Sequence, residues 1–91
     1  MNWNTQILID FQQGKLDLLY RNVYPGLILY AIKYLGEESE FLAEDCVQNA
    51  IFSAWERRNK FDSVYTFKAF LYMAIKNDII SIVFKLINND N

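Results

Sequence analysis

The chain has 91 residues, a formal net charge of −2 and a hydrophobic share of 53%. This length predicts one domain with a modest core, and because such a core cannot hide so many apolar side chains, we expect some of them to face a partner. The absence of histidine excludes His-based catalysis and the usual zinc sites, and the single cysteine, Cys46, excludes an internal disulfide.

Helical periodicity runs along the whole chain, and no alternation of period two is sustained. This pattern predicts an all-α fold. We expect a compact bundle of three to four helices in one domain, residues 1–87, followed by a frayed polar tail, residues 88–91.

The first helix is expected after a cap at Asn2 or Asn4, and it should run to about Gln13, where Gly14 ends it. A glycine supplies the backbone conformation that most other residues avoid at a helix end. The helix boundary is therefore predicted from the capping residues at its two ends.

The second helix is expected to begin near Lys15 and to close at Gly36. Pro25 lies inside its apolar stripe. Because the apolar period resumes beyond the proline, we expect the helix to bend there rather than to end. The stripe consists of Leu16, Leu19, Tyr20, Val23, Leu27, Ala31 and Tyr34.

Ser39 is the candidate N-cap of the third helix, which should end between Arg57 and Asn59. Cations there would meet the negative end of the helix dipole. We interpret Cys46 as a small buried core residue of this helix. The full apolar stripe is Leu42, Cys46, Val47, Ala50, Ile51, Ala54 and Trp55.

A loop is expected from Lys60 to Tyr65, and a fourth helix from about Thr66 to Leu86. The predicted buried side of this helix is Leu71, Ala74, Ile75, Asp78 or Ile79, Ile82 and Leu86. Near its end the helix is apolar almost all round, which is unusual for a helix that faces solvent. We therefore expect either a homodimer through this C-terminal segment or a tightly packed C-terminus.

Charge is divided unevenly along the chain. Residues 1–56 hold three cations and eight carboxylates, and residues 57–91 hold six cations and three carboxylates. The first part therefore carries −5 and the second +3. Such a division is expected for two partners of opposite charge, and it also arises by chance in a short chain.

The sequence indicates no enzyme. Glu44 and Asp45 are adjacent, so on a helix they diverge by about 100° and cannot form an acid–base pair. There is no glycine-rich phosphate loop and no nucleophile beside a base, so we expect no catalytic residue, no metal and no cofactor. No secretory signal and no apolar run of about 18 residues is present, and we expect a cytoplasmic protein without a membrane contact.

Two surfaces of different chemistry can be read from the pattern. The third helix gathers carboxylate and amide groups, which indicates a docking face: Glu44, Asp45, Gln48 and Asn49. On the fourth helix Lys68, Tyr72 and Lys76 share one side because they are four residues apart. Lysines meet phosphates and aromatic rings stack on unpaired bases, so this side suits single-stranded nucleic acid. The aromatic residues just before it, Phe61, Tyr65 and Phe67, are alternatively core residues.

The order of these residues resembles region 2 of bacterial RNA polymerase sigma factors of the extracytoplasmic-function type. The resemblance covers about residues 5–85. Its first segment is Leu19-Tyr20, Tyr24-Pro25, Leu27, Ala31 and Leu35-Gly36. Its middle segment is the run of thirteen residues from Ala43 to Trp55. Its last segment is Phe67, Phe70-Leu71-Tyr72, Ile75-Lys76-Asn77 and Ser81.

The resemblance implies that the third helix docks on the clamp coiled coil of the polymerase largest subunit. By analogy Asp45, Gln48 and Asn49 contact the clamp, and Phe52 and Trp55 support or border them. Polar groups of this kind suit an arginine-rich coiled coil. The chain departs from the family at Asn49, where a glutamate is usual.

The resemblance also implies that the loop and the fourth helix recognise the promoter −10 element and keep its strands apart. The implied residues are Phe61, Tyr65, Thr66, Phe67, Lys68, Tyr72, Lys76 and Asn77. Here Lys76 replaces an arginine and Ser81 an aspartate, and the arginines usual beyond that position are missing. We therefore expect weak, salt-sensitive binding of DNA.

Region 4, the helix-turn-helix that reads the −35 element in this family, is expected to be absent from the 91 residues. The alternative function is a sigma-like interaction module that binds polymerase or an anti-sigma factor and has no promoter activity. The acidic balance and the missing arginines favour this alternative. Binding to single-stranded −10 DNA distinguishes the two.

Overall fold

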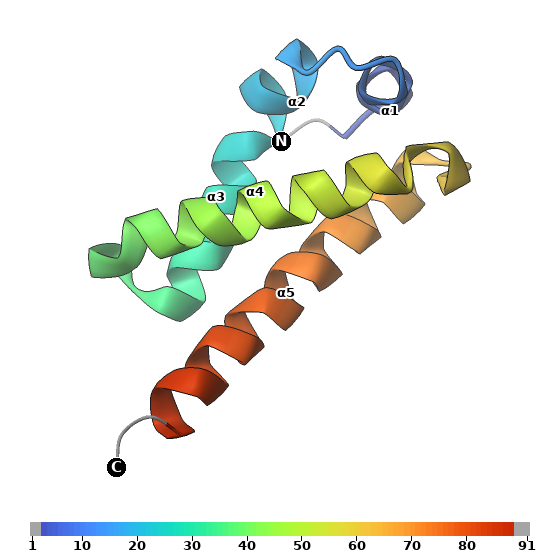
Figure 1. Cartoon of the computed structure of the whole chain (residues 1–91). Coiled ribbons are helices and arrows are strands. Elements are labelled where there is room, and N and C mark those ends of the chain that lie inside the picture. The colour runs from blue at the N-terminus through green and yellow to red at the C-terminus, as the bar shows by residue number, and fades with distance from the viewer. Residues whose placement is uncertain (1–2, 89–91) are drawn as a thin grey trace.

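The computed structural model describes residues 3–88, and its regular elements are all helical. Helices α4 and α5 are the long ones and cross each other, with α3 packed against both and the short α1 and α2 at one end (Figure 1). The predicted all-α bundle is confirmed. The elements are α1 (Thr5–Gln12), α2 (Asp17–Asn22), α3 (Tyr24–Leu35), η1 (Glu37–Ser39), α4 (Glu40–Glu56), η2 (Arg58–Lys60) and α5 (Val64–Asn88).

The ends of α1 are as predicted. The side chain of Asn4 accepts a hydrogen bond from the backbone N–H of Ile7 at 3.2 Å, so it caps the helix. Gly14 follows the helix with φ +81°, a conformation that an L side chain rarely adopts. The other proposed cap, Asn2, and residues 89–91 of the proposed tail lie outside the described residues.

The prediction of one bent helix around Pro25 is wrong. One helix ends at Asn22, and a second begins at Tyr24 with Pro25 in its first turn. A proline has no N–H to donate, but the first N–H groups of a helix have no intrahelical acceptor, so this position costs the helix nothing. The predicted stop at Gly36 is confirmed, with φ +91°.

The last helix begins earlier than predicted, at Val64, because Ser63 caps it. The hydroxyl of Ser63 accepts a hydrogen bond from the backbone N–H of Thr66 at 3.2 Å. At the other end α5 includes Asn88, the first residue of the proposed tail. Ser39 stands at the predicted cap of α4 but makes no capping bond with its side chain, and the turn η1 precedes the helix instead.

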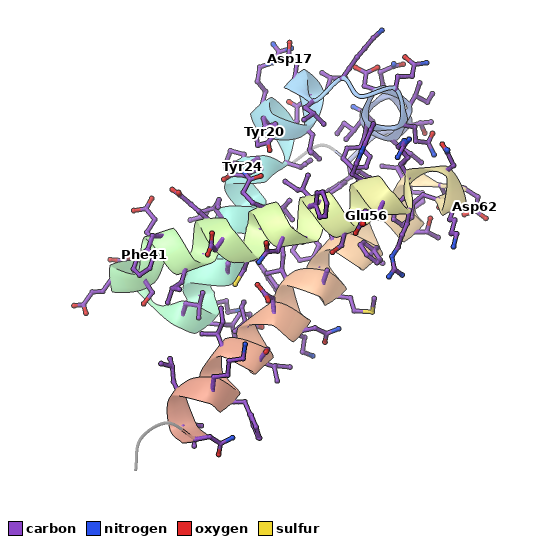
Figure 2. All side chains as sticks on the ribbon, in the orientation of Figure 1. Asp17, Tyr20, Tyr24, Phe41, Glu56 and Asp62 are labelled. Atoms are coloured by element: carbon purple, nitrogen blue, oxygen red, sulfur yellow. The ribbon has the colours of Figure 1, made fainter. Side chains whose placement is uncertain are left out.

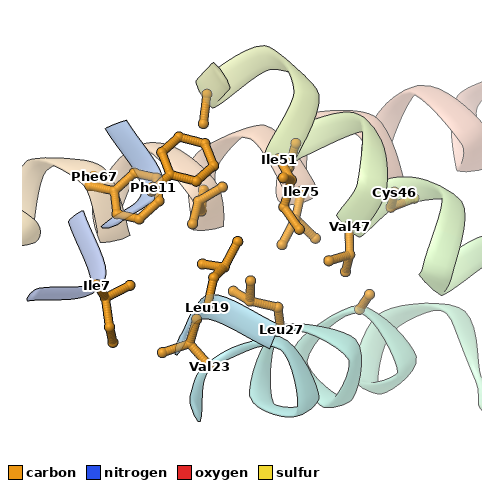
Figure 3. Close-up of a cluster of buried hydrophobic side chains, with 14 of the residues drawn as sticks. Ile7, Phe11, Leu19, Val23, Leu27, Cys46, Val47, Ile51, Phe67 and Ile75 are labelled. Carbon is orange, nitrogen blue, oxygen red and sulfur yellow. The ribbon is translucent and has the colours of Figure 1, made fainter. Parts of the chain in front are cut away.

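The core is apolar throughout, and no polar or charged side chain of the described residues is buried in it. Figure 3 shows the rings of Phe11 and Phe67 side by side, with Cys46 further along the same core. Cys46 is fully buried, as predicted. Leu86, predicted to be buried, is 64% exposed because the last turns of α5 extend past α3 and α4. Within residues 3–88 no helix combines the length and the apolar character that a membrane span requires.

Candidate functional site

A pocket of about 350 Å³ opens between α1, α2 and α4. Three of the residues predicted to form a docking face, Gln48, Phe52 and Trp55, line it. Asp45 precedes Gln48 by three residues and is exposed, so it lies on the same side of α4. The complete lining is Phe11, Gly14, Leu16, Tyr20, Gln48, Ile51, Phe52 and Trp55.

The amide of Gln48 is held between two tyrosine hydroxyls. Tyr20 donates to its oxygen at 3.1 Å, and its nitrogen donates to the Tyr24 hydroxyl at 3.3 Å. The two tyrosine rings lie 4.8 Å apart, and Figure 2 shows them on the part of α2 and α3 that borders α4. An amide offers two donors and two acceptor sites, so half of this capacity is left for a partner.

Trp55 forms one wall of the pocket and is fixed from two sides. Its ring system forms a T-shaped pair with the ring of Phe11, with centroids 5.8 Å apart and planes at 88°. The guanidinium of Arg58 lies 3.9 Å from the ring centroid and donates to the Trp55 carbonyl at 2.9 Å. Gln12 donates to the carbonyls of Arg58 and Phe61 at 2.7 and 3.1 Å, which ties the turn η2 to α1.

Asn49 is separated from the other predicted docking residues. It faces α5, where its amide donates to the Asp78 carboxylate at 3.4 Å. With Asn77 it lines a small polar hollow of about 260 Å³ between α4 and α5.

Burial, together with a hydrogen bond to Asp78, raises the pKa of the Cys46 thiol to about 12. Helical spacing within α4 and α5 does not reveal that these groups meet across the two helices.

Seven of the eight residues predicted to contact DNA lie on different sides of α5, and the eighth, Phe61, precedes the helix. Tyr65, Lys68, Tyr72 and Lys76 follow one another at helical spacing and share one side. Phe61 and Thr66 line a separate apolar hollow of about 320 Å³ with Ala69, Phe70 and Met73. Asn77 lies on the α4 side, in the polar hollow.

Phe67 lies in the core. Its side chain is 0% exposed, and its ring contacts Phe11 at 4.7 Å, Phe61 at 5.3 Å and Trp3 at 6.1 Å between centroids. In this conformation its ring has no free face for a base. Of the two sequence-based readings of Phe67, the core residue is the one that the structure bears out.

Four further rings form a continuous series, the aromatic row: Trp3, Tyr72, Tyr30 and Tyr34. The centroid distances from one ring to the next are 6.3, 4.8 and 5.2 Å. Burial, together with the neighbouring Tyr34, raises the pKa of Tyr30, and burial alone raises the pKa of Tyr72. Sequence reasoning found only Tyr72, although the i, i+4 spacing of Tyr30 and Tyr34 was a visible signal.

A family model described as Sigma-70 region 2 matches residues 19–85 of the chain. The match begins inside α2 and ends in the last turns of α5, so it includes the whole of α4. Trp3 and α1 precede it. No curated protein and no solved structure matches the chain.

Proposed function

The chain belongs to the sigma-70 region 2 family, and on this premise we propose that it docks on the polymerase clamp coiled coil through α4 and binds the promoter −10 element through α5. Sigma region 2 takes part in transcription initiation with RNA polymerase and promoter DNA. The proposal assigns each of these two partners to its own side of the molecule.

The observation that carries the docking proposal is the fixed amide of Gln48 at the pocket. Interfaces derive most of their affinity from a few anchors that fill well-packed pockets. Here the pocket offers aromatic walls, an amide whose direction two tyrosines hold, and the 63% exposed ring of Phe52. The exposed carboxylate of Asp45 on the same side favours a basic partner helix.

The proposed strand surface is the side of α5 that carries Tyr65, Lys68, Tyr72 and Lys76. The ring of Tyr65 is 74% exposed and both lysines are exposed. Bases stack on such rings regardless of their sequence, and the cations neutralise phosphates. Because only two lysines stand on this side, the affinity should be low, and added salt should lower it further with a shallow slope.

The docking proposal is tested with a peptide of the clamp coiled coil titrated into the chain. Replacing Gln48 by alanine should weaken binding at least about five-fold while the helical signal and the unfolding midpoint stay close to those of the parent. The matched control is Gln6→Ala, because Gln6 is an exposed glutamine that bonds only locally, to Asp10 at 2.6 Å. A folded, monomeric chain that fails to bind the peptide at high micromolar concentration contradicts the proposal.

The alternative is an interaction module that binds polymerase or an anti-sigma factor without promoter activity. The small number of cationic side chains in α5 favours this alternative, since Lys85 is the one cation between Lys76 and Asn88. A labelled −10 non-template strand at low salt decides the matter. Saturable, sequence-dependent binding excludes the module, and no binding excludes the promoter function.

We also propose that the exposed end of α5 pairs with a second copy of the chain. The end projects beyond the bundle (Figure 1), and its apolar side chains, together with Tyr34 of α3, border a hollow of about 350 Å³. A second copy presents the same exposed apolar side chains beside the same hollow. In a two-fold pairing, the side chains of each copy can therefore pack into the hollow of the other. The exposed apolar residues are Ile80, Val83, Phe84, Leu86 and Ile87, between 39% and 68% exposed.

A further inference from the structure

The aromatic row joins three parts of the chain that are far apart in sequence. Trp3 precedes α1, Tyr72 is in the middle of α5, and Tyr30 and Tyr34 are one turn apart on α3. Every ring of the row is at least partly exposed, and Tyr34 is 55% exposed, whereas the core side chains are 6% exposed or less. The row is therefore a surface feature that runs from α5 onto α3.

The rings of the row are not stacked in parallel on one another. Their planes meet at 55°, 83° and 69°, so none of the three contacts is a parallel stack. Two of the contacts are T-shaped and that of Trp3 with Tyr72 is tilted, and such contacts hold the rings in place. The most exposed ring of the row is that of Tyr34.

A lysine stands at each end of the row. The ammonium of Lys68 lies 5.8 Å from the centroid of Trp3, and that of Lys33 lies 5.9 Å from the centroid of Tyr34. Rings flanked by cations suit single-stranded nucleic acid, whose bases are planar and whose phosphates are negative. Neither an apolar peptide nor a membrane surface would require this combination.

The row is also continuous with the proposed −10 surface, because Tyr72 belongs to both and Lys68 of that surface lies over Trp3 at the end of the row. We propose that the aromatic row extends the single-strand track from α5 onto α3, with Trp3, Tyr30 and Tyr34 stacking on bases beyond those that α5 contacts. This inference rests on the proposed strand binding and adds three residues and a longer footprint to it. The structural alternative is that the row only seals the N-terminal segment against α3 and α5.

The test measures binding of two single strands at low salt: a short −10 non-template strand, and the same strand lengthened by several nucleotides at either end. The variant is Tyr34→Ala, which removes an exposed ring at little risk to the fold. Because Tyr34 also borders the hollow at the end of α5, binding is measured at a protein concentration at which light scattering shows a monomer. Tyr34→Phe keeps the ring and loses only the hydroxyl. Phe41→Ala is the matched control, because Phe41 is 69% exposed at the start of α4 and lies outside the row (Figure 2).

We expect Tyr34→Ala to weaken the lengthened strand about five- to hundred-fold and to leave the short strand unchanged. Tyr34→Phe and Phe41→Ala should bind both strands like the parent. If Tyr34→Ala binds the lengthened strand like the parent while Lys68→Ala loses both strands, the extension is overturned and the proposed function stands. If the parent binds neither strand, the proposed function fails and the extension with it.

Discussion

The Tyr20 hydroxyl donates a hydrogen bond to the Gln48 side-chain oxygen at 3.1 Å and so joins α2 to α4 across 28 positions of the sequence. This bond fixes which side of the amide points to α2 and which remains open at the pocket. Together with the bond from Gln48 to the Tyr24 hydroxyl, it joins the polar part of the proposed docking face to the aromatic part.

Replacing Tyr20 by phenylalanine tests the role of this contact. The ring stays in the pocket wall, but the donor to the Gln48 oxygen is lost, so only the bond to Tyr24 still holds the amide. We expect clamp-peptide affinity to fall by a few fold and the free energy of unfolding to change by about 1 kcal/mol or less. Calorimetric titration and urea unfolding measure the two quantities, and an unchanged affinity would mean that the amide's direction is irrelevant to docking.

The sequence groups Asn49 with the docking residues of α4, whereas in the structure its amide donates to Asp78 of α5. Asn49→Asp puts a second carboxylate beside Asp78, where the amide now donates at 3.4 Å. We expect a small loss of stability that high salt reduces, because like charges repel and salt screens them. Clamp-peptide affinity should stay unchanged. A clear change in affinity with unchanged stability would return Asn49 to the docking face.

Phe67 and Tyr65 are two residues apart on α5, but truncation should lower the stability much more at Phe67 than at Tyr65. Phe67→Ala should lower the free energy of unfolding by about 3–5 kcal/mol, because it leaves a cavity in the core. Tyr65→Ala should change it by less than about 0.5 kcal/mol. If Phe67→Ala does not fold, Phe67→Leu gives a smaller, measurable loss. Equal stability of Phe67→Ala and the parent would contradict its place in the core.

Alkaline pH should destabilise the protein through Cys46. Burial and the hydrogen bond to Asp78 raise the pKa of its thiol from 9.0 to about 12, and unfolding restores the ordinary value. Above pH 9 the unfolded chain releases a proton that the folded chain keeps, so the free energy of unfolding falls as pH rises, by up to about 1.4 kcal/mol per pH unit.

Urea unfolding of the parent and of Cys46→Ala at a series of pH values from 8 to 11 measures this effect. The variant should lose the contribution of the thiol and keep that of Tyr30 and Tyr72, whose pKa values are also raised and which act in both proteins. The difference between the two proteins therefore isolates Cys46. Parallel stability curves would show that the thiol does not contribute.

Self-association through α5 is expected to depend on its exposed end. Phe84→Ser should lower the average mass seen by light scattering towards that of the monomer, because it removes a side chain that is 64% exposed and lines the hollow. The control is Met73→Ser, a 54% exposed residue of the same helix outside this patch. A parent mass that is monomeric and independent of concentration would contradict the pairing.

Much of the fold could be predicted from the sequence, because the signals are local. The cap at Asn4, the stop at Gly36 and the buried Cys46 follow from helix periodicity and capping chemistry, and all three are confirmed. The local signal failed at Pro25, because an apolar period that continues across a proline is compatible both with one bent helix and with two successive ones.

In the candidate site, too, some features follow from local helical spacing and others from the packing of separate helices. Helical spacing alone brings Gln48, Phe52 and Trp55 to one side of α4. By itself the sequence therefore determined that the chain is a helical bundle of the sigma region 2 type and which residues share a helix side. Only the tertiary structure decided that Asn49 turns to Asp78, that Phe67 is enclosed, and that Trp3 meets the tyrosines of α3 and α5, because each of these depends on how separate helices pack against one another.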